Sequence, residues 1–188
     1  MKTTTLYPGM CDDSLEIFYH PEEKKLKAIF NSRIMDYAEL PNSETEFLEE
    51  IIEDEAMTRT ILNSWFPGNL KKQKEQLAKC RFGGLNFSPD RESGSGNLSA
   101  DLFDCPYKDT CVGRGIVCNN VKYQNHELSE KEVRFISLMS TEECNKSIAE
   151  KLEMPEGTFQ VFRTKFYEKL NVKTKQELTR VGVFLGIA

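Results

Sequence analysis

The stretch that decides the fold of the C-terminal part is "EGTFQVFRTKFYEKL", residues 156–170. At about 100° per residue, its four Phe and Leu anchors share a helical face within roughly 80° of arc. These anchors are Phe159, Phe162, Phe166 and Leu170. The opposite face consists of Gln160, Val161, Thr164 and Lys165. The pattern predicts a helix with one narrow packed face and one exposed face that can hydrogen-bond to a partner.

The flanking sequence predicts further helices with clear boundaries. Ser129 and Glu132 have capping-box spacing at a helix start, and Thr174 and Glu177 have the same spacing at another. The expected helices cover about 129–139, 145–152 and 156–170, and a last one begins after Thr174. Residues 126–188 are therefore expected to form one helical domain.

Charge is distributed unevenly along the chain. The net charge of −5 argues against a globally basic nucleic-acid binder. Residues 126–188, however, hold ten basic and ten acidic residues, and the segment 158–175 holds five cations and one carboxylate. A local basic patch of this kind is sufficient to hold phosphates. A Gln can pair with adenine and a Val methyl can contact the thymine methyl, so the exposed helix face is suited to a DNA major groove.

The C-terminal third resembles the LuxR/GerE-type helix-turn-helix domain of bacterial transcription regulators, from about residue 128 to 187. The pieces that carry the resemblance are "LSEKEV", "NKSIAEKL", "EGTFQVFR" and "KLNVKTKQEL". The resemblance implies an all-α, four-helix domain whose third helix enters the major groove of double-stranded DNA. It also implies a homodimer through the last helix. Sigma-factor region 4 domains share EGT-like turns but usually lack the appended last helix. The alternative to a DNA-binding domain is a small all-helical core whose basic patch is only a solvated face.

The resemblance also implies roles for particular residues. Those expected to face bases are Gln160, Val161 and Thr164. Those expected at or near the DNA backbone are Thr158, Arg163, Lys165, Asn145, Lys146, Lys173 and Lys175. The sequence departs from the family pattern at Cys144 (a capping Ser), Gln160 (a frequent Lys) and Phe162 (a frequent His). Because Gln160 removes one cation, we expect lower non-specific DNA affinity than the family pattern suggests.

Residues 1–79 are expected to form an α+β region. Alternating apolar residues over 15–30 predict a hairpin. Ser43 and Glu46 have the spacing of a capping box, which predicts a single helix from 43 to 66 that ends at Pro67-Gly68. A short basic helix is expected over 69–79. The regular strand–helix alternation of a receiver domain is absent.

Residues 80–125 form a cysteine-rich segment that includes an expected mobile loop over 88–99. Cys80, Cys105, Cys111 and Cys118 are separated by 24, 5 and 6 residues. Structural zinc usually has pairs with two to four intervening residues, whereas this wider spacing looks somewhat like iron–sulfur sites of some nucleic-acid-processing proteins. Three interpretations stay open: zinc, an iron–sulfur cluster, or buried or redox-reactive free thiols.

The sequence thus favours a sequence-specific transcriptional regulator that senses redox or metal state through the four cysteines. The alternative is a protein-interaction module that contacts RNA polymerase or another transcription factor, with DNA binding secondary. An enzyme is not expected, because two His residues and no nucleophile–base pair leave little for catalysis. The start of the chain lacks the apolar core of a secretory signal and no stretch is long enough to span a membrane, so a cytoplasmic protein is expected.

Overall fold

The computed structural model describes residues 6–118, 121–124 and 126–188. The chain forms two compact units, Met1–Asn119 and Asn120–Ala188.

The first unit contains a three-stranded antiparallel sheet in the order β1 (Glu16–His20), β2 (Lys25–Phe30) and β3 (Arg33–Asp36). The predicted hairpin is confirmed, with Ile17 opposite Ala28. The third strand was not predicted. It follows a two-residue turn in which Asn31 and Ser32 both have positive φ, as a tight primed turn requires.

The helices of the first unit are α1 (Glu46–Asp54), α2 (Ala56–Trp65) and α3 (Leu70–Phe82). The single helix expected over 43–66 is wrong, because Glu55 is extended (φ −96°, ψ 90°) and separates α1 from α2. The Ser43–Glu46 capping box is also wrong: Thr45 is the N-cap residue of α1, and Ser43 lies in a preceding 3₁₀ turn. The basic helix is confirmed as α3, which continues through Cys80.

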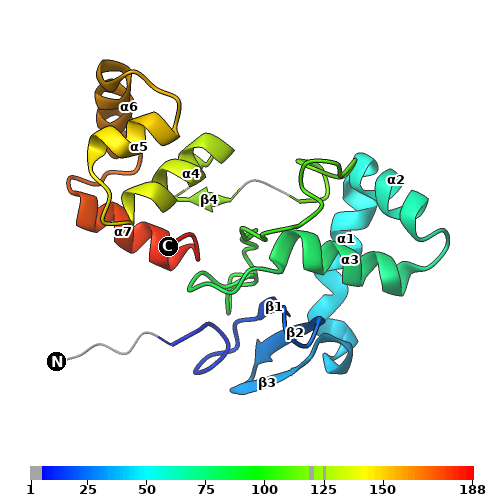
Figure 1. Cartoon of the computed structure of the whole chain (residues 1–188). Helices are drawn as coiled ribbons and strands as arrows, with labels where there is room; N and C mark the ends of the chain where they lie inside the picture. The colour runs from blue at the N-terminus through cyan, green and yellow to red at the C-terminus, as the bar shows by residue number, and fades with distance from the viewer. Residues whose placement is uncertain (1–5, 119–120, 125) are drawn as a thin grey trace. The chain divides into compact units, whose positions relative to one another are not determined.

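The hydrophobic core of the first unit lies where α1 and α3 pack with the sheet (Figure 1). Its fully buried apolar side chains come from strand β1 and the residue before it, from all three helices and from the segment after Cys111. They include Leu15, Ile17, Leu48, Leu62, Leu77, Phe82 and Val117. The presence of Val117 shows that the cysteine-rich segment is part of this core.

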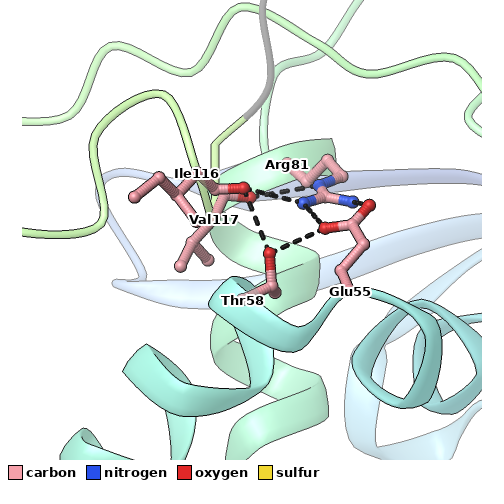
Figure 2. Close-up of polar contacts among 5 residues, drawn as sticks. All are labelled: Glu55, Thr58, Arg81, Ile116 and Val117. Atoms are coloured by element: carbon pink, nitrogen blue, oxygen red, sulfur yellow. Dashed lines mark hydrogen bonds and ion pairs between the residues drawn. The ribbon is translucent and has the colours of Figure 1, made fainter.

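A buried arginine ties the cysteine-rich segment to the helices (Figure 2). The Arg81 guanidinium forms a two-pronged ion pair with Glu55, with both distances 2.8 Å. It also donates to the carbonyl oxygens of Val117 (Nε, 3.1 Å) and Ile116 (Nη2, 3.0 Å). Thr58 donates from Oγ1 to both the Glu55 carboxylate and the Ile116 carbonyl. The Arg81 hydrogen bond and ion pair hold the pKa of Glu55 below its usual value. This network explains why Glu55 interrupts the predicted helix.

Segment 88–99, expected to be a mobile loop, is anchored by its backbone. Arg91 exchanges two backbone hydrogen bonds with Leu15, and Ser99 N–H donates to the Asp90 carbonyl. The side chain of Asp90 is fully buried and accepts a hydrogen bond from the Ile17 amide. Sequence reasoning missed this role because Gly, Ser and Asp are ordinary loop residues.

The second unit is built mainly from α4 (Glu130–Met139), α5 (Asn145–Lys151), α6 (Glu156–Lys169) and α7 (Lys175–Phe184). Strands β4 (Lys122–Tyr123) and β5 (His126–Glu127) form a short hairpin before α4, so the expectation of an all-α domain is wrong in that detail. The Ser129–Glu132 capping box is confirmed, and Thr174 caps α7 by accepting from the Glu177 amide. The chain therefore combines an α+β unit with a mainly helical one.

Candidate nucleic-acid interface

Helix α6 is fixed through one aromatic side chain of α4. The ring of Phe135 is fully buried and lies 5.8 Å from Phe159, 5.1 Å from Phe162 and 5.4 Å from Phe166, measured between ring centroids. The last two contacts are edge-to-face, an arrangement that aromatic rings favour. Phe159, Phe166 and Leu170 are at most 2% exposed, whereas Phe162 is half-buried. The apolar face of α6 thus packs as its sequence predicts.

The opposite face of α6 is open. Gln160, Thr164 and Lys165 are exposed, and Val161 has 56% of its surface exposed. The Thr164 hydroxyl donates to the Gln160 carbonyl at 3.0 Å, so this side chain offers a partner its methyl group and its oxygen lone pairs. Gln160 keeps both a donor and an acceptor. This face can make the polar and methyl contacts that reading base edges requires.

Beside this face lies a hollow of about 560 Å³. It is lined by residues from the end of α4, the start of α5, α6 and the turn into α7. Five of them were predicted DNA contacts: Asn145, Arg163, Thr164, Lys173 and Lys175. Residues that are far apart in sequence thus line one concave, basic surface.

The cations that line the hollow, and Lys169 at the adjoining end of α6, differ in how many contacts they make within their own unit. Lys169 is committed to its own unit, because its ammonium lies 2.7 Å from Glu132 Oε1 and 3.0 Å from the Glu127 carbonyl. Lys175 donates to the Glu143 carbonyl at 3.2 Å. Within the described residues, Arg163 and Lys173 form no ion pair. Their charges are therefore available to an anionic partner.

The other predicted contacts lie outside the hollow, on the surfaces of α5 and α6. They are Lys146, Thr158, Gln160, Val161 and Lys165, all of them exposed. Sequence reasoning missed Tyr167 and Glu168, which also line the hollow. Tyr167 follows Arg163 by four residues, a spacing that places two side chains on the same helix face. Burial raises the pKa of Tyr167, so it stays a neutral hydroxyl at ordinary pH.

The turn between α5 and α6 fixes the angle of the two helices. After Leu152, Glu153 takes a left-handed conformation (φ 54°), its amide donates to Glu150, and the Met154 amide donates to Ala149. This is the Schellman arrangement that ends many helices. Pro155 then precedes α6. A short helix, a tight turn and a helix with an open polar face define a helix-turn-helix domain.

Comparison with known families agrees with this class. Residues 126–181 match the family described as "Bacterial regulatory proteins, luxR family" (GerE). The resemblance seen in the sequence is therefore confirmed over this C-terminal part. The match supports a DNA-binding transcription regulator. Neither the curated proteins nor the solved structures gave a match.

The four cysteines of the predicted metal site are all half-buried free thiols in the first unit. Among the residues that the structure describes, no three Cys, His, Asp or Glu side chains come close enough to hold one metal ion. Cys80 lies near the end of α3, and the other three lie in the segment that follows. Cys11 and Cys144 are exposed.

None of the described helices is both long and apolar enough to cross a membrane.

Proposed function

We propose that the protein is a sequence-specific transcription regulator whose helix α6 lies in the major groove of double-stranded DNA. The observation that carries this proposal is the division of α6 into a Phe face locked onto Phe135 and an open face of Gln160, Val161 and Thr164. The hollow beside it supplies Arg163 and Lys173 for phosphates. In this arrangement, cations set the position on the duplex and the open face reads bases.

The test is DNA binding by the full chain at several salt concentrations, with Arg163→Ala as the probe. Each phosphate contact contributes roughly 0.9 to the slope of log K against log salt on duplex DNA. On a mixed-sequence duplex we expect Arg163→Ala to weaken binding and to lower that slope by about 1.

Lys131→Ala is the matched control, because Lys131 is an exposed cation of the same unit that does not line the hollow. We expect this variant to bind like the wild type. Equal losses in the two variants would mean that only overall charge matters, and the proposed site would be wrong.

We further propose that the protein dimerises through α7. Val183 and Phe184 are 45% and 39% exposed at adjacent positions near the end of this helix, and together they offer an apolar surface to a partner. Two copies would read two half-sites on one DNA molecule. The proposed dimer would be wrong if the full chain sediments only as a monomer and Val183→Ser leaves DNA binding unchanged.

A protein-interaction module that contacts RNA polymerase is the second candidate. The same exposed apolar residues of α7 would serve such a partner. This second candidate is favoured if Arg163→Ala binds both RNA polymerase and DNA as well as the wild type does.

A further inference from the structure

Another hollow, the sheet-end hollow, lies in the first unit where β1 ends, β2 begins and β3 ends. Its volume is about 460 Å³, which is within the range of small-ligand sites. Its walls come from these strand ends, from the 3₁₀ turn Tyr37–Glu39, from the residue after α2 and from one face of α3. Residues from five parts of the unit thus surround one space.

Cations are concentrated in the sheet-end hollow. Its charged lining residues are Lys24, Lys25, Asp36, Lys72, Glu75 and Lys79. They include four of the 15 basic residues in segment 1–125, but only two of its 20 acidic ones. Asp36 is neutralised, because its carboxylate lies 2.8 Å from Lys25 Nζ and 3.4 Å from Lys27 Nζ. The remaining charge of the lining is therefore positive.

Three of these cations can still bind an anion. Lys24 and Lys72 are exposed and form no ion pair within the described residues. The ammonium of Lys79 lies 3.8 Å from the centroid of the Tyr19 ring. Such a contact holds the cation over the ring face but leaves its N–H donors available to another group.

The position of Lys72 also points to an anion. This residue lies in the first turn of α3, which contains no acidic residue. The helix dipole disfavours a cation there and favours a negative charge. An anion bound beside Lys72 would offset this unfavourable placement.

The rest of the lining suits a planar ring and a sugar. Tyr37 and Phe66 contribute half-buried aromatic rings. Burial raises the pKa of Tyr37, and the charge of Glu75 raises it further, so the Tyr37 hydroxyl keeps its proton. The exposed carboxylate of Glu75 can accept a hydrogen bond from a sugar hydroxyl.

We propose that the sheet-end hollow binds a mononucleotide. The ammonium groups of Lys24, Lys72 and Lys79 hold the phosphate through charge-assisted hydrogen bonds. Glu75 accepts from the sugar, and the two half-buried rings pack against the base.

A small ligand fits this part of the chain better than a nucleic-acid strand does. The adjoining hollow, which shares Tyr37 and Ala38 with the sheet-end hollow, is lined by the carboxylates of Glu46 and Glu49. A longer polyanion that left the sheet-end hollow on this side would meet these negative charges. The net charge of segment 1–125 is also negative, so it gives no long-range attraction for a polyanion.

The test is isothermal titration calorimetry of the full chain with the four ribonucleoside monophosphates at fixed ionic strength. We expect at least one of them to bind with a Kd below about 1 mM. Inorganic phosphate, and the same nucleoside without its phosphate, should each bind at least about tenfold more weakly, because each makes only part of the contacts. No binding of any monophosphate at this concentration would overturn the proposal. Inorganic phosphate that binds as tightly as the nucleotide would also overturn it.

Lys72→Ala tests the location of the site. Because a hydrogen bond to a charged group is lost, we expect the Kd of the monophosphate to rise by about tenfold or more. Lys71→Ala is the matched control, since Lys71 is the neighbouring exposed cation of α3 and lines the adjoining hollow instead. It should bind the nucleotide like the wild type, and circular dichroism checks that both variants are folded. Equal losses in the two variants would refute the assignment.

Arg163→Ala separates this proposal from the proposed DNA contact. Arg163 lines the hollow of the second unit, so its substitution should weaken DNA binding and leave nucleotide binding unchanged. Nucleotide binding that is lost in Arg163→Ala but kept in Lys72→Ala would place the nucleotide in the second unit and overturn the proposal. The two proposals can therefore fail independently.

Discussion

Three carboxyl groups lie inside the first unit, and they are its most unusual residues. Glu16 and Asp90 are 0% exposed and Asp101 is 4% exposed. The Asn86 amide donates to Glu16, and its side-chain nitrogen donates to Asp101. Burial raises the pKa of each acid, and repulsion among the three raises the pKa of Glu16 and Asp90 further. In the described structure one oxygen of each carboxyl accepts no hydrogen bond. A proton shared within the group would satisfy some of these oxygens.

These acids make stability depend on pH in a defined direction. Burial raises the pKa of Asp101 to about 8, above the value of about 4 of an unfolded chain. A raised pKa means that the folded state holds the proton more tightly. The stability from this group is therefore present below about pH 4 and lost as pH rises through about 8.

We expect Asp101→Asn, which keeps the shape without the charge, to raise the unfolding midpoint relative to wild type at about pH 9 and to change it little at about pH 5. Thermal unfolding at both pH values measures this. Asp13→Asn, at an exposed position, is the control and should follow the wild type. An Asp101→Asn variant that is less stable than wild type at about pH 9 would show that the carboxylate is needed in its charged form.

At the scale of elements, the second unit depends on the contact between α4 and α6. Phe135 is the one ring of α4 that touches three rings of α6 in the described structure. Removing a buried Phe side chain destabilises proteins by about 3–5 kcal/mol. We expect Phe135→Ala to lower the free energy of unfolding of the second unit by an amount of this order, measured on the full chain by circular dichroism in denaturant.

Val161→Ala is the control for that measurement, because Val161 is exposed on the same helix. Its effect should lie within about 0.5 kcal/mol of zero. A loss below about 1 kcal/mol in Phe135→Ala would mean that α6 is held by other contacts.

Elements with local signals could be predicted from the sequence. The Ser129–Glu132 cap, the Phe stripe of α6 and the first hairpin all have periodic or capping patterns that act within a few residues. The helices expected over 145–152 and 156–170 are confirmed to within one residue at their ends, although the left-handed positions that follow them are Glu153 and Asn171 and not Gly. In both cases the closing backbone hydrogen bonds stabilise the turn.

Elements set by distant contacts could not be predicted. The break at Glu55 depends on Arg81, which lies 26 residues away in sequence. Asp90 accepts a hydrogen bond from the Ile17 amide of β1, 73 residues away in sequence, and Asp101 is held by the Asn86 side chain and the Arg81 carbonyl. For the candidate DNA site, the residues could be expected from the family resemblance. The hollow could not, because its lining comes from α5, α6 and the turn into α7, which are separate in sequence.

At the scale of the whole molecule, the two units have different chemistry. The first holds four half-buried free thiols and the buried acids. The second holds the open helix face and the basic hollow, and its sequence matches the luxR family. The net charge of −5 is therefore a poor guide to function, because the segment 158–175 concentrates five cations beside α6.

A selection from a randomised pool of duplex DNA measures whether the open face of α6 reads base edges. The wild type should enrich a defined sequence. Gln160→Ala should lose preference at one base position, with affinity for the wild-type site lowered by about 1–3 kcal/mol, while Lys131→Ala enriches the wild-type sequence. An unchanged sequence and affinity for both Gln160→Ala and Thr164→Ala would contradict this role of the open face.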